Sequence, residues 1–339
     1  MGFVYVANIF ADTVSVIASS TNSVIATVPV GDRPNAIEIT PDGKFVYVAN
    51  QDDDTVSVIA TSTNSVIATV PVGDRPFDIV ISPDGKFVYV TTSSANTVSV
   101  IATSTNSVIA IVPLGNPFDI VISPDGKFVY VTNTNGDGTV SVIATSTNSV
   151  IATVPVGDRP NAIVITPDGK FVYVANGFDA TVSVIATSTN SVIATVPVVG
   201  INPIGMVITP DGKFVYVTNQ VNDIVSVIAI STNSVIATVP VGDDPEALEI
   251  TPDGKFVYVA NRGDDTVSVI ATSTNSVIAT IGVGNLGFSV GIVISPDGKF
   301  VYVANEDDDT VSVIATSTNS VIATVPVGEN PFVIVITPK

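Results

Sequence analysis

The sequence contains no cysteine, no histidine and no tryptophan. Without cysteine, no disulfide can report the redox compartment of the protein. Histidine is the commonest general base and a frequent metal ligand, so its absence removes the usual centre of acid–base and metal chemistry. Catalytic pairs of serine with histidine, or cysteine with histidine, are excluded outright.

Charge is scarce, and nearly all of it has one sign. Charged residues make up 13% of the 339 positions, and the net charge is −19. Nucleic acids and anionic membranes attract positive surfaces, so we expect neither as a partner. No apolar run approaches the roughly 18 residues of a spanning helix, which predicts no membrane insertion. No signal peptide is recognised, because Met1-Gly2 leads directly into FVYVAN.

One stretch, seen in full at 83–124, recurs along the whole chain. The proline of a Ser/Thr-Pro-Asp-Gly-Lys turn repeats at intervals of 41 to 44 residues, and a truncated copy ends the chain at Thr337-Pro338-Lys339. The segments FVYV, VSVIA and STNSVIA each occur eight times. Periods of this length are typical of solenoids, propellers and other repeat arrays.

Each copy contains four runs of β-branched and aromatic residues, exemplified by 78–82, 44–50, 55–60 and 65–72. Runs of this composition between turn signals predict β-strands. Pro-Asp-Gly-Lys predicts a tight turn with glycine at positive φ, and Ser-Thr-Asn-Ser a second reversal with asparagine in the left-handed region. No segment has a helical period, so we expect no helices.

Four antiparallel strands repeated at this period predict an all-β, single eight-bladed β-propeller over 1–339. The chain begins with a second-type strand and ends with a first-type strand, 332–336. If these strands pair, three strands from the N-terminus and one from the C-terminus complete the last blade. Met1 and Lys339 are then expected within hairpin distance.

The repeats resemble those of the YVTN-family β-propellers of surface-layer and cell-surface proteins. The residues that carry the resemblance are Tyr-Val-Ala/Thr-Asn, as at 5–8 and 47–50, the Pro-Asp-Gly-Lys turns and the Thr-Val-Ser-Val-Ile strands. The resemblance covers the whole chain. It implies a binding or structural role, a location at the cell surface or outside the cell, and no catalytic residues.

All length differences between the copies fall on one side of such a propeller. We call "turn face" the side formed by the Pro-Asp-Gly-Lys and Ser-Thr-Asn-Ser turns. We call "loop face" the side formed by the second-to-third and fourth-to-first loops. Seven of the 31 acidic residues are turn-face aspartates, so 24 lie in or next to the loop-face loops, with only four arginines. The sequence therefore predicts an acidic, variable loop face.

Several loop-face residues are candidate ligand contacts around the central channel. Glu38 and Glu249 replace a valine of the other first strands. Each is either hydrated by channel water or a ligand-binding or acid–base group. With the arginines, Asp78 and Asp119 are the expected polar lining of a central pocket, although each arginine could instead pair with the aspartate before it. The arginines are Arg33, Arg75 and Arg159.

Aromatic and oxygen-rich loop segments complete the candidates. All eight tyrosines and eight phenylalanines lie in FVYV strands, where we expect them to pack between blades. Six phenylalanines lie in or beside the loops, either capping the core or stacking on a ligand: Phe10, Phe77, Phe118, Phe178, Phe288 and Phe332. Calcium is a weaker prediction, at Asn133, Asn135 and Asp137 or at the triplets 52–54 and 307–309. A hydrated acidic loop is the favoured interpretation of these segments, and no other cofactor is expected.

We therefore expect a non-enzymatic binding or scaffold module, a monomer whose loop face takes a protein or a glycan. One alternative is a lactonase-like propeller hydrolase that uses channel carboxylates and arginines. A quinone-dependent dehydrogenase is disfavoured by the absent tryptophan and cysteine. A further alternative, suggested by the uniform copies, is a recently amplified or engineered repeat protein without a ligand.

Overall fold

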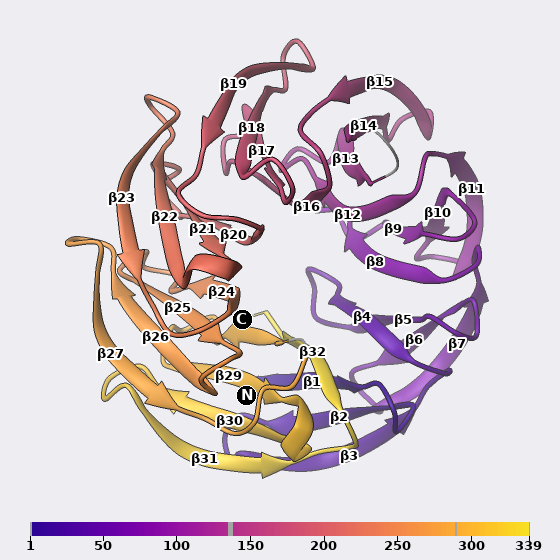
Figure 1. The fold of residues 1–339 in the computed structure, drawn as a ribbon. Coiled ribbons are helices and arrows are strands. Elements are labelled where there is room, and N and C mark those ends of the chain that lie inside the picture. Colours follow the sequence, from indigo (N-terminus) through magenta and orange to yellow (C-terminus); the bar gives the residue numbers. More distant parts are fainter. Residues whose placement is uncertain (1, 135–137, 289, 339) are drawn as a thin grey trace. The chain divides into compact units, whose positions relative to one another are not determined.

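The computed structural model describes residues 2–134, 138–288 and 290–338. The fold is an eight-bladed β-propeller in which each blade is a sheet of four antiparallel strands, as expected (Figure 1). The prediction of no helices is wrong at two short places, the 3₁₀ turns η1 (Gln220–Asn222) and η2 (Glu306–Asp308). Both lie in second-to-third loops, just before an aspartate in the left-handed region.

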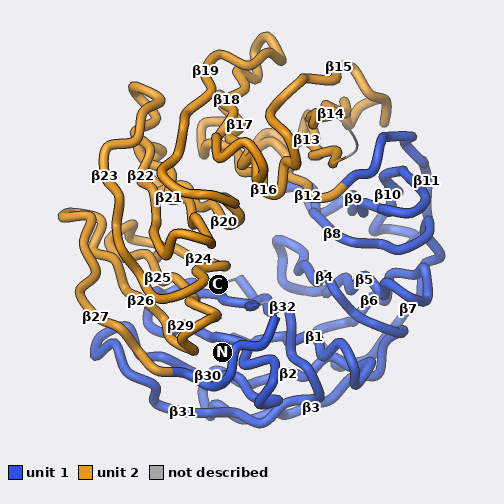
Figure 2. The backbone as a smooth tube through the Cα atoms, viewed as in Figure 1, with its two compact units in different colours: residues 1–117, 283–339 blue, residues 118–282 orange. Residues whose placement is uncertain are grey.

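The chain forms two compact units of four blades, residues 1–117 with 283–339 and residues 118–282 (Figure 2). We number the blades in chain order. Unit 1 contains blades 1 to 3 and blade 8, and unit 2 contains blades 4 to 7.

In unit 1, blade 1 has the strand order β3-β2-β1-β32, and the other three blades each use four consecutive strands. The strands of unit 1 are β1 (Phe3–Asn8), β2 (Thr13–Ala18), β3 (Ser23–Pro29), β4 (Pro34–Ile39), β5 (Phe45–Asn50), β6 (Thr55–Ala60), β7 (Ser65–Pro71), β8 (Pro76–Ile81), β9 (Phe87–Thr92), β10 (Thr97–Ala102), β11 (Ser107–Pro113), β28 (Ile292–Ile294), β29 (Phe300–Asn305), β30 (Thr310–Ala315), β31 (Ser320–Pro326) and β32 (Pro331–Ile336).

In unit 2, every blade uses four consecutive strands. The strands of unit 2 are β12 (Pro117–Ile122), β13 (Phe128–Asn133), β14 (Thr139–Ala144), β15 (Ser149–Pro155), β16 (Pro160–Ile165), β17 (Phe171–Asn176), β18 (Thr181–Ala186), β19 (Ser191–Pro197), β20 (Pro203–Ile208), β21 (Phe214–Asn219), β22 (Ile224–Ala229), β23 (Ser234–Pro240), β24 (Pro245–Ile250), β25 (Phe256–Asn261), β26 (Thr266–Ala271) and β27 (Ser276–Gly282).

The predicted closure of blade 1 is confirmed. β32 pairs antiparallel with β1, and Val6 lies opposite Ile334. Beyond this ladder, the amide of Phe3 donates to Oγ1 of Thr337, and the amide of Thr337 donates back to the Phe3 carbonyl, both at 2.9 Å. Met1 and Lys339 lie outside the described residues, so the confirmation rests on their neighbours in these two strands.

Burial differs between the strands of a blade in the way the sequence pattern predicts. The second and third strands are buried on both faces, because neighbouring blades cover them, and this explains their unbroken apolar runs. The fourth strand alternates exposed and partly buried residues. All eight FVYV tyrosines are fully buried, and Tyr5 lies among valines and isoleucines of blades 1 and 2.

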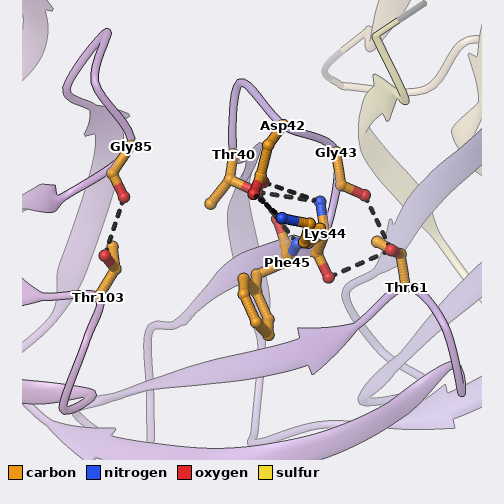
Figure 3. A network of polar contacts seen from close by, with 8 residues as sticks. All are labelled: Thr40, Asp42, Gly43, Lys44, Phe45, Thr61, Gly85 and Thr103. Atoms are coloured by element: carbon orange, nitrogen blue, oxygen red, sulfur yellow. Dashed lines mark hydrogen bonds and ion pairs between the residues drawn. The ribbon is translucent and has the colours of Figure 1, made fainter.

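The Pro-Asp-Gly-Lys turns are self-contained polar networks (Figure 3). The hydroxyl of Thr40 donates to Oδ1 of Asp42 at 2.8 Å and accepts from the amides of Lys44 and Phe45. Lys44 Nζ lies 2.9 Å from Oδ2 of Asp42, and Gly43 has the expected positive φ of 69°. The hydroxyl of Thr61, which opens the next turn of the blade, donates to the Gly43 carbonyl at 2.8 Å. In this turn, the polar side chains and the backbone groups therefore satisfy one another.

Candidate functional site

The loops between blades adopt an uncommon backbone conformation at the position before the inner-strand proline. Arg33, Arg75 and Arg159 have φ values of 57°, 56° and 52°, in the left-handed region that residues other than glycine seldom occupy. Such a residue costs about 1 kcal/mol or more, so the surrounding contacts must stabilise it.

Carboxylates from the two adjacent blades stabilise these loops. The amide of Asp32 donates to Oδ2 of Asp53 in blade 2, and the amide of Arg33 donates to Oδ1 of Asp12 in blade 1, both at 2.9 Å. The amide of Arg75 donates in the same way to Oδ1 of Asp54 at 2.8 Å. Much of the predicted acidic loop face therefore has a structural role, because these aspartates bind loop amides.

The arginine side chains predicted to line a central pocket are exposed on the loops. Arg33 makes only a long contact of 3.9 Å with Asp52, and both side chains are about half exposed. Arg159 lies over the ring of Phe178, with its guanidinium carbon 4.9 Å from the ring centroid. Two of the aspartates that precede these arginines donate from their amides to a carboxylate of the next blade, Asp32 to Asp53 at 2.9 Å and Asp158 to Asp179 at 2.8 Å.

Asp78 and Asp119 lie on the inner strands β8 and β12, where the sequence placed them. Each carboxylate accepts a hydrogen bond of 2.8 Å from the amide of the next residue. In unit 2, Oδ2 of Asp119 also accepts from the amide of Ile163 on β16 at 2.9 Å, which links blade 4 to blade 5. Asp119 thus holds two inner strands together and still lies at an open groove.

Glu38 and Glu249 are half-buried on β4 and β24. Loss of hydration raises the pKa of each carboxyl to about 7, and for Glu38 the negative charge of Asp78 adds to this rise. Each carboxyl also accepts a hydrogen bond from the amide of the following residue. The amide of Ile39 donates to Oε1 of Glu38 at 3.3 Å, and the amide of Ile250 donates to Glu249. A carboxyl with a pKa near 7 can exchange protons at neutral pH, which suits a general acid or base.

The inner strands of unit 2 border an open groove of about 330 Å³. Its walls are mostly apolar, from Ile163 and Val164 of β16 to Leu248 of β24. Asp119 and Glu246 supply its carboxylates. Sequence reasoning missed Glu246, which follows the inner-strand proline at a position held by phenylalanine or asparagine in several other blades.

Arg262 is the second residue that the sequence prediction left out. It is the least exposed arginine of the described chain and forms a short ion pair with Asp244, while its Nε lies 3.7 Å from Oε2 of Glu246. The second-to-third loop of blade 7 thereby orients the carboxylate at the groove. The signal in the sequence was the isolated arginine after the Tyr-Val-Ala-Asn segment, at a position where no other copy has a basic residue.

The six phenylalanines outside the FVYV strands divide into two groups. Phe77, Phe118 and Phe332 are half-buried on inner strands, so both a capping role and contact with a ligand stay open for them. Phe10, Phe178 and Phe288 are exposed on loops. Capping the core therefore does not describe the second group.

The predicted calcium sites fall partly outside the described residues. Asn135 and Asp137 lie outside the described residues, and Nδ2 of Asn133 donates to the hydroxyls of Thr139 and Ser141. In the triplet 52–54, Asp53 and Asp54 accept hydrogen bonds from loop amides. Across the described ranges, no group of three or more acidic side chains is arranged to hold a metal ion. None of the helical segments described has the length and hydropathy of a membrane span.

Two family models match the chain. The model described as "Lactonase, 7-bladed beta-propeller" matches residues 138–239 and 235–324, and the model described as "YNCE-like beta-propeller" matches 1–112 and 45–137. No curated protein sequence matches the chain.

Solved structures with similar folds include a chain of Kuenenia stuttgartiensis hydrazine synthase, with 26% identity, a TM-score of 0.70, and coverage of 84% of this chain and 96% of that one. Dihydro-heme d1 dehydrogenase NirN, solved in complex with DHE, has 16% identity, a TM-score of 0.84 and coverage of 98% and 74%. A functionally unknown protein from Desulfotomaculum acetoxidans DSM 771 has 18% identity, a TM-score of 0.69 and coverage of 99% of both chains.

The YVTN type is not among the matched models, so the surface-layer assignment stays a prediction. The lactonase model describes seven blades, whereas this chain has eight, and its two matches each cover only part of the repeat array. Together they span 138–324, more than half of the 339 residues, and the chain therefore belongs to the family described as "Lactonase, 7-bladed beta-propeller".

Proposed function

We propose that the chain is a non-enzymatic binding or scaffold module that recognises a protein or a glycan at its loop face. The observation that carries the proposal is the contrast between the two faces. Turn-face groups such as Asp42 and Lys44 satisfy one another, whereas the loop face varies between blades and holds the groove at Asp119 and Glu246. Variable loops on a rigid scaffold are the usual place for recognition.

The groove suits binding better than covalent catalysis. Its carboxylates lie among apolar side chains, a composition that fixes a ligand through a few polar contacts and apolar burial. The chain has no histidine or cysteine to form a nucleophile–base pair. A cell-surface or extracellular setting, a monomeric state and independence from a bound cofactor belong to the same proposal. Their support is the resemblance of the repeats to those of YVTN-type propellers.

The arrangement of lysines provides a test. Every lysine belongs to a Pro-Asp-Gly-Lys turn or to the truncated turn at the C-terminus. Biotinylation of lysines therefore immobilises the protein through its turn face and leaves the loop face accessible. We expect such a surface to select ligands from a glycan array or a random peptide library, and acetylation of the lysines to leave their affinity unchanged.

A triple variant, R33Q/R75Q/R159Q, tests whether the ligands bind at the loop face. These exposed side chains can be shortened without disturbing the core. We expect a change of at least tenfold in the Kd of ligands that cover the inter-blade loops. Ligands that no longer bind after lysine acetylation, yet bind the triple variant normally, would show that recognition occurs at the turn face and would contradict the proposal. Failure of both libraries to yield any ligand would overturn the proposal.

Lactone hydrolysis is a second candidate, favoured by the family match and by the carboxyls of Glu38 and Glu249. With a pKa of about 7, either carboxylate could take a proton from water as the water oxygen attacks the lactone carbonyl. The acid would then return the proton to the ring oxygen as the C–O bond breaks. Lactone turnover that falls at least 100-fold in E38Q or E249Q but not in E329Q, an exposed control, would establish this activity. Equal turnover in all variants would exclude both glutamates.

A further inference from the structure

Blade 6 departs from the other blades at the loop face. Ile201 occupies the loop position that holds an aspartate in four other blades, and Val221 occupies a position that holds an aspartate in two. The aspartates equivalent to Ile201 are Asp32, Asp74, Asp158 and Asp243, and those equivalent to Val221 are Asp52 and Asp307. Phe10 and Phe178 occupy the Val221 position in blades 1 and 5, so blade 6 is distinguished by apolar side chains at both positions.

These side chains are exposed. Val199 and Ile201 expose 55% and 57% of their surface, and Val221 exposes 61%. Phe178, on the loop of the preceding blade 5, exposes 64%. We call these four residues the blade 6 patch. Large apolar side chains gathered on one surface of a protein usually mark an interaction site.

Hydrogen bonds hold the loops of the patch together. The amide of Val221 donates to the Ile201 carbonyl at 3.4 Å, and the amide of Ile201 donates to Oδ1 of Asn222 at 2.8 Å. The amide of Val198 donates to the carbonyl of Ala180, on the loop that carries Phe178, at 3.1 Å. The loop that carries Phe178 is therefore bonded to the segment that leads into the Ile201 loop, and the Ile201 loop is bonded to the Val221 loop, all within unit 2.

Negative charge concentrates at one edge of the patch, where Asp223, Asp243, Asp244 and Asp264 outnumber the one arginine there, Arg262, which pairs with Asp244. Asp223 lies two residues after Val221, and its Oδ1 accepts from the amide of Asp244 at 2.9 Å. The amide of Asp243 donates to Oδ2 of Asp264 at 2.8 Å. Repulsion from Asp264, Asp223 and Asp244 raises the pKa of Asp243 above its ordinary value. A cation placed here would relieve this repulsion.

We infer that the blade 6 patch binds a segment of a protein partner with apolar side chains at its centre and lysine or arginine beside them. The apolar residues would cover Ile201 and Val221, while the cations would pair with the aspartates at the edge. Buried aromatic and aliphatic contacts give affinity, and complementary charge gives fast association and orientation. This inference rests on the proposed binding function and names its partner.

Arg159, at the Phe178 end of the patch, determines the orientation of the bound segment. Arg159 covers one face of the Phe178 ring, so the partner's basic residues should avoid that end and lie towards blade 7. The patch should therefore bind a segment whose basic residues lie on the blade 7 side of its apolar residues, and not a segment with the opposite arrangement.

The inference is tested with a phage-displayed library of random 12-residue peptides, selected on biotinylated wild-type protein. The counter-target is I201D/V221D, which restores at both positions the aspartate of sibling blades. The backbone bonds of Ile201 and Val221 do not involve their side chains, so we expect this variant to fold and melt like the wild type. The matched control is I67D, at an isoleucine that is 50% exposed on the outer strand β7.

We expect enriched peptides to combine aromatic or aliphatic residues with lysine or arginine, and to bind I201D/V221D at least tenfold more weakly than I67D. D243N should weaken binding several-fold at low salt and reduce its salt dependence. Peptides that bind both variants equally, or that are neutral or acidic, would refute this site while leaving the binding function intact. A glycan-only ligand set, or no ligand at all, would also refute it, and the latter would remove the proposed function too.

Discussion

The hydroxyl of Tyr5 donates a hydrogen bond of 2.9 Å to Oδ1 of Asn64, 59 residues later in the neighbouring blade. The same bond joins Tyr47 to Asn106, and in unit 2 it joins Tyr216 to Asn275. The asparagine is the left-handed residue of the Ser-Thr-Asn-Ser turn. One residue of the FVYV strand thus fills the space between two blades and holds the turn of the next.

Removal of this bond should destabilise the protein measurably. In Y47F the phenyl ring still fills the core, but Oδ1 of Asn106 loses its donor, so we expect the free energy of unfolding to fall by about 1 kcal/mol. The control is Y130F, because in the described part of the chain the hydroxyl of Tyr130 has no partner. Urea denaturation of both variants should show the larger loss for Y47F. Equal losses would contradict an energetic role for the bond.

The Pro-Asp-Gly-Lys aspartates should make stability depend on acidity. Hydrogen bonds from Lys127 and Ser123 lower the pKa of Asp125 to about 2 from its ordinary 3.8. The carboxylate therefore stabilises the fold fully above about pH 4, and this contribution is lost as pH falls through 2. We expect D125N to be less stable than the wild type at pH 6 and equal to it near pH 2. The difference should be small, since the side chain is about half exposed.

Glu38 and Glu249 should make the stability of the fold fall as pH rises, which is the opposite of the effect of Asp125. Their folded pKa of about 7 lies above the ordinary 4.5, so the folded state retains protons that the unfolded state releases. Stability attributable to each group should fall as pH rises from 4.5 through 7. E38V, which installs the residue of most other blades, should gain more stability over the wild type at pH 8 than at pH 4. A pH-independent gain would show that Glu38 does not titrate in this range.

The aspartates that bind loop amides predict a difference between two neighbouring substitutions. The carboxylate of Asp54 accepts from the amide of Arg75, and Asp54 has a φ of 57°. The carboxylate of Asp52 lies 3.9 Å from Arg33, and the hydrogen bond of Asp52 to the Asp32 carbonyl comes from its backbone amide, which an alanine keeps. We expect D54A to cost about 1 to 2 kcal/mol, and D54N much less, because asparagine keeps the acceptor and tolerates this backbone. Asn96 performs the same task in blade 3. Thermal melting should place D52A close to the wild type, and a D52A as unstable as D54A would refute this division of roles.

A circular permutant tests the closure of blade 1. Linking Pro338 to Phe3 through Asp-Gly-Lys recreates the turn found in every other blade, and new termini can be opened in the turn at 83–86. We expect the permutant to fold and to melt within a few degrees of the parent. A permutant that fails to fold would show that β1 and β32 need free ends, whereas opening the chain within β5 should abolish folding in either case.

The fold was predictable because each copy has the same turn residues and the same β-strand pattern at the same positions. Asparagine and glycine at fixed places determine the turns, and unbroken valine runs such as Val46 and Val48 require cover on both faces. The loop face was less predictable, because the sequence shows only that an aspartate is charged. It does not show whether the carboxylate is hydrated or accepts from an amide 21 residues away, as that of Asp53 does. The pairing of Arg262 with Asp244 and Glu246 likewise depends on loop geometry that no periodic pattern specifies.

The bond between Phe3 and Thr337 spans 334 residues, and it has a consequence for protein synthesis. The ribosome makes β1 before β32 and before all the strands between them, so the first sheet has one unpaired edge while the other sheets form. That edge meets a succession of nearly identical inner strands during translation. Faithful assembly then depends on each of those strands being captured by its own hairpin partner before it can reach β1.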